Sequence, residues 1–309
     1  MSTPTLITTY VNPDLDGIAG ITAYAEFLQK AGQNVVVGTI DKLSDETKYV
    51  LHRFGFEYPM SISNSNGFDE VILVDTSDLN GLEGKIAPEK VIEIIDHRKV
   101  HETEKFPNAK KVQIELVGAA ATLVAEKFME RRMEISEKSA ILICTAIISN
   151  THNFKGSVTT DRDRKAFDWL NQFAKLPENL WREMFLAKSD LSGDKLAETI
   201  RKEFAWFVMG DKKVGIAQLE VLEAKKLLEE RGTEILQILE QTKKDMELDL
   251  IFQNTVAIEE EKNYFVTDDE QMQKLLEKVF EIEFIGSVAE KTGLVMRKQI
   301  VPLLKVELE

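Results

Sequence analysis

The sequence lacks several features that other classes of protein need. It has a single cysteine, Cys144, so no disulfide can form within the chain. Its longest apolar run, residues 140–148, is interrupted by Thr145 and is too short to span a bilayer. Because no basic, apolar leader-like segment opens the sequence either, we expect a cytoplasmic protein.

Basic residues are also scarce. Lys and Arg total 39 against 53 Asp and Glu, which gives a formal net charge of -14. Such an acidic surface repels long nucleic acid and anionic membranes, so we expect neither as a partner. A small polyanionic substrate would need a local basic pocket or bound metal ions to offset this field.

The first half of the sequence is rich in apolar runs that alternate with helix patterns. Strand-like runs cover residues 5–11, 34–40, 70–78 and 90–98, and helix patterns cover 18–32, 44–55, 118–132 and 136–150. Continuous apolar strands separated by helices predict an α/β domain, a parallel sheet with helices on both faces. We expect this domain to span residues 1–188.

The pattern changes near residue 190, where residues 187–195 have the turn-forming composition of a linker. Beyond it, strand patterns at 213–222, 248–260 and 303–309 enclose a long charged helix at 223–246 and a shorter one at 268–280. These patterns predict a second, smaller α+β domain over residues 195–309.

Carboxylates follow three of the predicted parallel strands. Asp14 and Asp16 come after the first strand, Asp75 ends another, and Asp96 and His97 end a third. The carboxyl ends of parallel strands converge on one crevice, where these groups would repel one another without cations. Any one Asp alone suits a turn or a helix cap, but the set favours a bound divalent metal.

The ordered series of motifs resembles the DHH phosphoesterase superfamily and, within it, the manganese-dependent (family II) inorganic pyrophosphatases. The matching stretches are NPDLDG (12–17), VDTSD (74–78), IDHRKV (95–100), VGAAATLV (117–124), residues 143–166, KEF (202–204), VGIAQLEV (214–221) and RKQIVPLL (297–304). The resemblance implies a DHH domain followed by a DHHA2-like substrate-binding domain. It also implies divalent metal, Mn²⁺ or Mg²⁺, and a small phosphate-containing substrate.

The same resemblance implies roles for individual residues. The implied metal ligands are Asp14, Asp16, Asp75, His97 and Asn150, with Asp75 expected to bridge two ions. The implied phosphate-binding residues are Lys202, Arg297 and Lys298. These basic residues would neutralise the substrate phosphates as a cleft between the domains closes.

Four positions depart from the family pattern. Tyr10 stands in place of a His, Asn150 in place of the last ligand Asp, Arg98 in place of the second His of the DHH motif, and Met296 in place of a basic residue. Arg98 does not titrate usefully, so it cannot act as a general acid, although it can stabilise phosphate charge in the catalytic site. A DHR motif also occurs in the prune-like exopolyphosphatase branch.

These departures predict an altered metal centre. We expect the ion held by Asp16, Asp75 and His97 to keep its ligands, and the ion at Asp14 and Asp75 to lose ligands at Tyr10 and Asn150. Oxygen in place of nitrogen shifts preference from manganese towards magnesium. His152, two residues after Asn150, is a candidate to replace a lost ligand or the lost acid.

The leading hypothesis is therefore a hydrolase of phosphoanhydride bonds that acts on pyrophosphate or short polyphosphate. One alternative is a phosphodiesterase on short oligonucleotides or cyclic nucleotides. That branch carries a glycine-rich motif in its second domain, whereas this chain has no two adjacent glycines. Another alternative is a catalytically impaired phosphate- or nucleotide-binding protein. The sequence leaves the oligomeric state open, a homodimer included.

Overall fold

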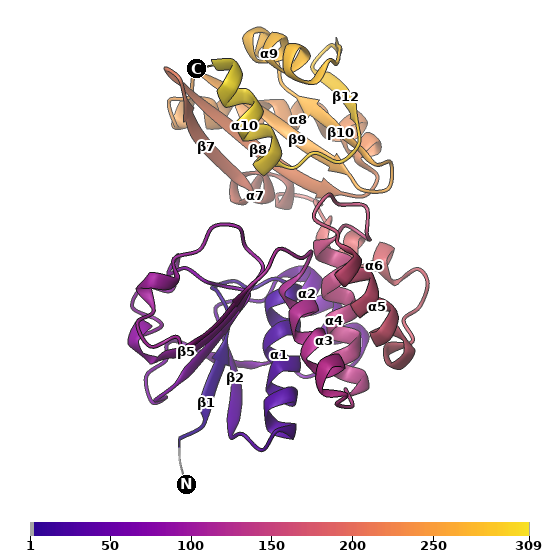
Figure 1. Cartoon of the computed structure of the whole chain (residues 1–309). Helices are drawn as coiled ribbons and strands as arrows, with labels where there is room; N and C mark the ends of the chain where they lie inside the picture. Colours follow the sequence, from indigo (N-terminus) through magenta and orange to yellow (C-terminus); the bar gives the residue numbers. More distant parts are fainter. Residues whose placement is uncertain (1–2, 309) are drawn as a thin grey trace. The chain divides into compact units, whose positions relative to one another are not determined.

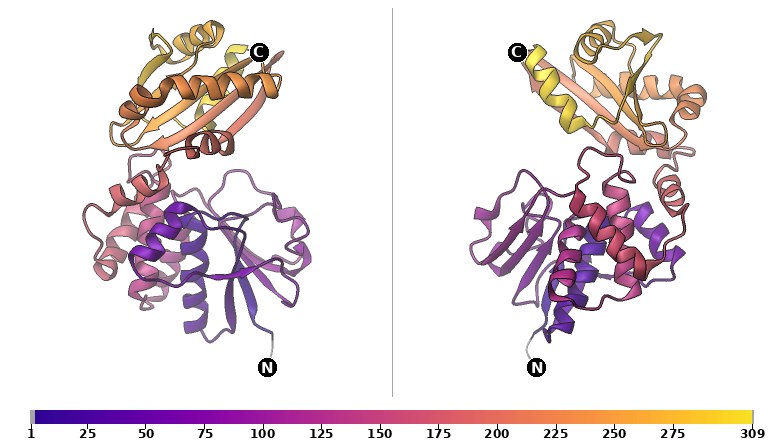
Figure 2. Two further views of the ribbon diagram at one scale, coloured as in Figure 1. Left: turned by 180° about the vertical axis from the view of Figure 1, so that it is seen from behind. Right: turned by 45° about the vertical axis from the view of Figure 1, so that its right-hand side comes forward.

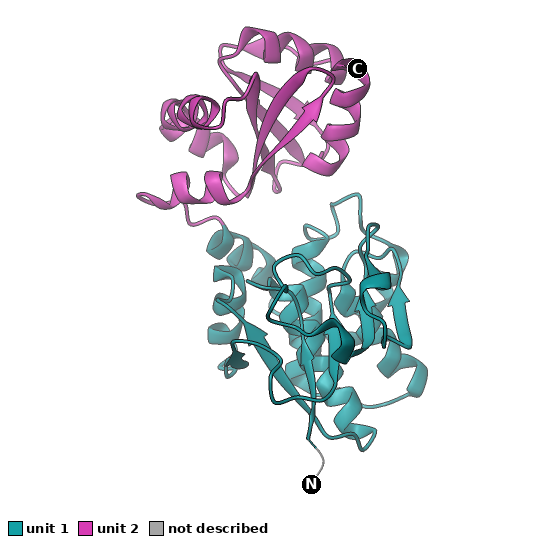
Figure 3. Cartoon of the chain, turned by 90° about the vertical axis from the view of Figure 1, so that its left-hand side faces the viewer, with its two compact units in different colours: residues 1–188 teal, residues 189–309 magenta. Residues whose placement is uncertain are grey.

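The structure is a computed structural model that describes residues 3–308. The chain divides into two compact units, with the boundary between Lys188 and Ser189 (Figure 3). Among the described residues, none of the helices has the length and apolar composition needed to cross a bilayer.

The first unit is built on a six-stranded sheet in the order β3-β2-β1-β4-β5-β6. Its strands are β1 (Thr5–Thr8), β2 (Val35–Ile40), β3 (Met60–Ile62), β4 (Val71–Val74), β5 (Val91–Asp96) and β6 (Lys111–Ile114). Every pair in the sheet is parallel, which confirms the predicted parallel sheet. β1 and β4 are neighbours at its centre although α1, β2, α2 and β3 intervene in sequence, and the loops after both strands reach the same edge.

The α-helices of the first unit lie on one side of this sheet in Figure 1 and in the right-hand view of Figure 2. They are α1 (Leu15–Lys30), α2 (Asp45–Arg53), α3 (Ala120–Arg131), α4 (Glu137–Asn150), α5 (Asp161–Ala174) and α6 (Leu180–Lys188). α4 packs between α1 and α5 and is buried continuously from Ser139 to Ser149, which includes Cys144. The expected caps at Ser44 and Thr160 are present at the starts of α2 and α5.

The opposite face of the sheet corrects one detail of the expected layers. It is covered by the connections between β4, β5 and β6, whose helical turns are the short 3₁₀ segments η1 (Pro88–Lys90) and η2 (Thr103–Lys105). Leu82, Ile86 and Phe106 from these connections pack against Leu6 and Leu73 of the sheet. Apolar residues of these connections, rather than long α-helices, therefore bury this face of the sheet.

The second unit contains a six-stranded mixed sheet in the order β11-β12-β10-β9-β8-β7. Its strands are β7 (Phe204–Met209), β8 (Lys212–Val221), β9 (Leu250–Ala257), β10 (Lys262–Val266), β11 (Phe284–Ile285) and β12 (Val288–Thr292), and its helices are α7 (Lys195–Lys202), α8 (Ala224–Asp245), α9 (Glu270–Phe280) and α10 (Arg297–Leu308). One core cluster packs α7 and α8 on one face, and another packs α9 and α10 on the other. The predicted strands at 213–222 and 248–260 and the predicted helices at 223–246 and 268–280 are all present.

The prediction of a strand at 303–309 is wrong for its described part, since residues 303–308 belong to α10. The alternation of Leu304, Val306 and Leu308 resembles a strand, but Val306 is exposed. The residues that α10 buries are Ile300 and Leu304, four apart, which is the helical spacing. Residue 309 lies outside the described residues.

Candidate metal centre

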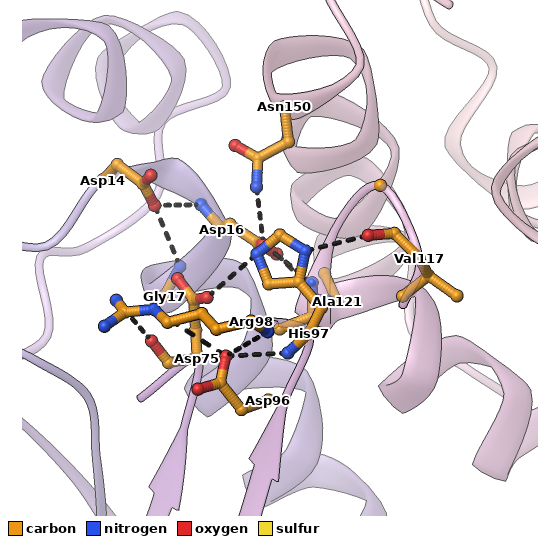
Figure 4. Close-up of polar contacts among 12 residues, drawn as sticks. Asp14, Asp16, Gly17, Asp75, Asp96, His97, Arg98, Val117, Ala121 and Asn150 are labelled. Carbon is orange, nitrogen blue, oxygen red and sulfur yellow. Dashed lines mark hydrogen bonds and ion pairs between the residues drawn. The ribbon is translucent and has the colours of Figure 1, made fainter. Parts of the chain in front are cut away.

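Two carboxylates with different roles, Asp14 and Asp16, follow β1. Asp14 is the N-cap of α1, and its Oδ1 accepts hydrogen bonds from the backbone N–H groups of Asp16 (2.8 Å) and Gly17 (3.2 Å). The hydroxyl oxygen of Tyr10 in turn accepts a hydrogen bond from the backbone N–H of Asp14 at 3.0 Å. One oxygen of Asp14 therefore holds the helix start (Figure 4). The Tyr10 hydroxyl holds the backbone of Asp14.

Asp16 is fully buried in the first turn of α1. Its two oxygens accept hydrogen bonds from the backbone N–H groups of Ala120 (2.7 Å) and Ala121 (2.8 Å), at the start of α3. The α3 N-cap, Ala119, has no side-chain cap of its own, so Asp16 caps a helix distant in sequence. Burial, and then the negative charge of Asp75, hold the pKa of Asp16 well above its ordinary value.

Asp75 lies directly after β4 in the left-handed backbone region, with φ of 62°. That conformation is unfavourable for a residue other than glycine, and such strain concentrates at functional sites. Its backbone N–H donates to the carbonyl of Ile95 at 2.8 Å, which ties the turn to β5. Burial, then the charge of Asp14, raise the pKa of Asp75 to about 6 against the opposing hydrogen bond from His97.

His97 follows β5 and completes the group. Its Nδ1 lies 2.9 Å from the carbonyl oxygen of Val117, and because a carbonyl only accepts, this nitrogen carries the proton. Nε2 then faces the carboxylates, 3.4 Å from Asp75 Oδ1 and 3.7 Å from Asp16 Oδ2. Burial opposes the charged imidazole, but the hydrogen bond to Asp75 and the charges of Asp75 and Asp16 raise the pKa of His97 to about 10.

One oxygen each from Asp16 and Asp75 and a nitrogen of His97 all lie within 4.8 Å of one another. Within residues 3–308 this is the one group of its kind. Burial raises the pKa values of Asp16 and Asp75, and the neighbouring carboxylates raise the pKa of His97 against the opposing effect of burial. Two carboxylate oxygens and one imidazole nitrogen whose proton sits on the far side form a donor set that fits a divalent cation.

Arg98 contacts Tyr10 beside this group. Its guanidinium lies over the Tyr10 ring, 5.1 Å from the ring centroid. Nη1 donates to Asp78 Oδ2 at 3.2 Å, and Nη2 donates to the backbone carbonyl of Asp75 at 3.1 Å. Burial, then the charges of Asp14 and Asp75, hold the pKa of Tyr10 well above its ordinary value, so Tyr10 is a neutral phenol. Tyr10 and Arg98, two of the positions that depart from the family pattern, are thus in direct contact.

The comparisons with known proteins match both halves of the chain. The DHH family, N-terminal domain, matches residues 4–147, and the DHHA2 domain matches residues 182–306. A manganese-dependent inorganic pyrophosphatase of Methanocaldococcus jannaschii is 32% identical over 306 residues, which is 95% of this chain and 96% of that protein. A protein of an Exiguobacterium species, named "Probable manganese-dependent inorganic pyrophosphatase", is 33% identical over 97% of both chains.

A solved structure gives the same result for the fold. The crystal structure from Methanococcus jannaschii, named for family II of the inorganic pyrophosphatases, has a TM-score of 0.73 and 30% identity, and the match covers 98% of this chain and 99% of that one. The chain belongs to the manganese-dependent, family II inorganic pyrophosphatases. The predicted resemblance, an N-terminal DHH domain followed by DHHA2, is confirmed.

In this family II chain, the side chain of Asn150 lies against Asp16, whereas it was expected at the position of Asp14 and Asp75. Its Nδ2 donates to Asp16 Oδ2 at 2.7 Å, so Asn150 accompanies the group of Asp16, Asp75 and His97 (Figure 4). This hydrogen bond places the amide against Asp16, and the expectation that Asn150 weakens the position at Asp14 stays a prediction. Asn150 is the last residue of α4, and α4 packs along α1, which brings its end over Asp16 in the first turn of α1.

Asp96 and His152 lie outside the group of three, and each contacts other residues. Asp96 accepts hydrogen bonds from the backbone N–H of His97 (2.7 Å), the backbone N–H of Arg98 (3.3 Å) and the hydroxyl of Ser77, so it orients the turn that carries His97. The sequence placed Asp96 among the converging carboxylates without this task. His152 stacks on Phe185 of α6, with ring centroids 6.5 Å apart, and lies outside the group of three.

The three expected basic residues belong to the second unit. Lys202 ends α7 and is exposed, Arg297 begins α10 and is half-buried, and Lys298 is exposed. Arg297 Nη1 donates to the backbone carbonyls of Glu203 (2.5 Å) and Ile216 (3.3 Å), which brings it next to the end of α7.

Proposed function

We propose that this chain is a metal-dependent hydrolase of phosphoanhydride bonds, acting on inorganic pyrophosphate or short polyphosphate. The observation that carries the proposal is the buried group of Asp16, Asp75 and His97 at the carboxyl edge of the sheet, in a chain that matches manganese-dependent pyrophosphatases over nearly its full length. Buried like charges destabilise a fold unless a cation accompanies them, so their presence supports a metal-binding role.

The residues that would hold a Mn²⁺ or Mg²⁺ ion are Asp16, Asp75 and His97, with the amide of Asn150 beside them. When bound, a divalent ion lowers the pKa of a water molecule and polarises phosphate oxygens. Backbone groups of the chain orient two of these side chains. The carbonyl of Val117 holds the His97 proton on Nδ1, and the α3 backbone N–H groups hold both oxygens of Asp16.

The proposed metal centre is altered near Asp14. Asp14 uses one oxygen as a helix cap, and the side chain nearest its backbone N–H is the neutral phenol of Tyr10. Arg98 supplies a permanent positive charge against Asp78 and the Asp75 carbonyl. We infer that this guanidinium takes over charge neutralisation there, that a second ion at Asp14 and Asp75 binds weakly, and that Arg98 stabilises phosphate charge without acting as an acid.

The second unit is proposed to bind substrate phosphate through Lys202, Arg297 and Lys298. Burial lowers the pKa of Arg297 against the opposing charges of Glu203 and Glu220, and no carboxylate within residues 3–308 forms an ion pair with its guanidinium. A desolvated guanidinium that lacks a carboxylate partner suits a phosphate anion, whose oxygens match its planar array of donors.

The test is phosphate release from pyrophosphate, tripolyphosphate and a dinucleotide, with Mg²⁺, Mn²⁺ and Co²⁺ compared. We expect release from pyrophosphate or tripolyphosphate. Asp75→Asn should reduce the rate at least about a hundredfold, because it removes a ligand charge. Asp69→Asn, on an exposed loop of the same unit, is the matched control and should not change the rate.

The alternatives give different results in the same assay. Release from the dinucleotide alone would indicate a phosphodiesterase. Binding of pyrophosphate without release under any metal would indicate a phosphate-binding protein whose catalytic function is impaired. Either result would overturn the proposed hydrolase.

A further inference from the structure

Three amide side chains form a buried hydrogen-bond network in the sheet of the second unit. Gln218 on β8 and Asn254 on β9 are paired across parallel strands, and Asn263 lies on β10, the next strand (Figure 1). Asn254 and Asn263 have no exposed surface. Asn263 Nδ2 donates to Asn254 Oδ1 at 2.5 Å, and Asn254 Nδ2 donates to Gln218 Oε1 at 3.3 Å.

The network also binds the loop between β12 and α10. The carbonyl oxygen of Val295 accepts hydrogen bonds from Asn254 Nδ2 (2.9 Å) and Asn263 Nδ2 (2.6 Å), and its backbone N–H donates to Asn263 Oδ1 at 2.8 Å. Both donors of each Asn amide are thereby used. Since a buried amide destabilises the fold when any of its groups is left unpaired, the network holds Val295 in one position.

The last link of the network reaches Arg297. Gln218 Oε1 accepts a hydrogen bond of 2.6 Å from the backbone N–H of Arg297, at the start of α10. On the side-chain end, Nη1 is held by the carbonyls of Glu203 and Ile216. No hydrogen bond within residues 3–308 uses Nε or Nη2. Arg297 is therefore held at its backbone N–H and at Nη1, while Nε and Nη2 remain available as donors.

We propose that Gln218, supported by Asn254 and Asn263, is a positioning residue that aligns Arg297 for a substrate phosphate. This inference rests on the proposed function, in which Arg297 binds phosphate. An arginine held in place before binding loses less side-chain freedom when the anion arrives, and so binds it more tightly. It also keeps its planar donors in the orientation that phosphate oxygens require. The requirement for alignment explains why Asn254 and Asn263 are buried in the sheet.

The test compares the full-length wild type with three variants. Gln218→Met keeps the side-chain length and removes the acceptor for the Arg297 N–H. The exchange of Gln218→Glu with Glu220→Gln keeps an acceptor at position 218 and the same net charge, because the Gln218 amide donates to Glu220 Oε1. Gln253→Met is the matched control, since Gln253 is buried in β9 and bonds to Thr255 but not to the α10 loop.

Two measurements are made on each protein: the dissociation constant of imidodiphosphate by calorimetry, and kcat and KM for pyrophosphate. For Gln218→Met we expect both the dissociation constant and KM to rise about tenfold with kcat nearly unchanged, as for loss of uniform binding. The exchange variant should restore most of the affinity, and Gln253→Met should bind as the wild type does. Thermal melting establishes that each variant is folded.

Each outcome separates the two proposals. If the wild type binds and hydrolyses but Gln218→Met and Gln253→Met show the same KM and dissociation constant, the positioning role is wrong and the hydrolase stands. If the wild type binds imidodiphosphate without hydrolysing pyrophosphate, the proposed function is wrong, while the dissociation constants still test Gln218. If the wild type neither binds imidodiphosphate nor hydrolyses pyrophosphate, both are wrong.

Discussion

The guanidinium of Arg98 lies over the ring of Tyr10, 5.1 Å from its centroid, and the hydroxyl of the same Tyr10 accepts a hydrogen bond from the backbone of Asp14. Two positions that depart from the family pattern, 88 residues apart in sequence (98 − 10), are therefore one structural feature. Replacing either one alone by His breaks their contact, so the proposed alteration of the metal centre is best tested by changing both.

The first prediction concerns the number of metal ions. We expect the wild type to bind one Mn²⁺ tightly, because Asp16, Asp75 and His97 form one ligand group and Arg98 is proposed to neutralise the neighbouring position. Tyr10→His combined with Arg98→His should add a second ion, since two imidazoles replace a phenol and a cation. Equilibrium dialysis counts the ions, and electron paramagnetic resonance distinguishes an isolated Mn²⁺ from a coupled pair.

Tyr10→Phe is the control for that experiment, because it removes only the hydroxyl and keeps the ring under Arg98. It should bind metal with the wild-type stoichiometry. A coupled pair of tightly bound Mn²⁺ ions in the wild type would show that Arg98 does not replace an ion.

The second prediction concerns Asn150. Asn150→Asp places another carboxylate against Asp16, where the amide nitrogen now donates at 2.7 Å. Without metal, the variant should lose roughly 2 kcal/mol of stability, because a hydrogen bond becomes a buried repulsion. With Mn²⁺ it should bind about tenfold more tightly, because the extra charge adds a ligand. Calorimetric titration and urea unfolding measure the two effects.

Asn66→Asp, on an exposed loop, is the matched substitution and should change neither quantity. If Asn150→Asp left the Mn²⁺ affinity at the wild-type value, Asn150 would lie beside Asp16 without belonging to the metal site.

The third prediction concerns the dependence of stability on metal. Mn²⁺ at about a hundredfold above its dissociation constant should stabilise the wild type by about 2.7 kcal/mol relative to protein treated with chelator. Asp75→Asn should lose most of this increment, because it removes one of the buried charges that the ion neutralises. Thermal melting with and without chelator measures it, and an equal increment in both proteins would place the ion elsewhere.

The fourth prediction concerns Asp163, a buried carboxylate that supports the centre from α5. It accepts hydrogen bonds from the backbone N–H of Gly118 (3.0 and 2.9 Å), from the hydroxyl of Thr122 (2.7 Å) and from Thr160, with which it forms the capping box of α5. Asp163→Ala should cost roughly 3 kcal/mol of stability, since several donors lose their acceptor.

The same substitution should weaken Mn²⁺ binding, because the segment that Asp163 holds also carries the Val117 carbonyl that orients His97. Asp161→Ala is the control: Asp161 is exposed at the first position of the same helix and should cost less than about 0.5 kcal/mol. Equal losses of stability in the two variants would contradict the role given to Asp163.

Much of the centre was predictable from short patterns. Asp14, Asp16, Asp75 and His97 each follow a parallel strand, and the rule that such strands end at one edge brings them together without further information. A helix pattern for α10 was also present, because Ile300, Leu304 and Leu308 are four residues apart. The alternation of apolar and charged residues over 304–308 favoured a strand instead. Burial of Ile300 and Leu304 against the sheet decided between the two periods.

The sequence by itself determined the parallel sheet, the carboxylates at its edge and the departures at Tyr10, Arg98 and Asn150, because strand ends and motif spacing are local properties. Only the tertiary structure decided which departures act together. The contact of Asn150 with Asp16 spans 134 positions and depends on α4 packing along α1, and that of Arg98 with Tyr10 depends on the loops that follow β1 and β5. Such pairings follow from how whole helices and strands pack, which no local pattern specifies.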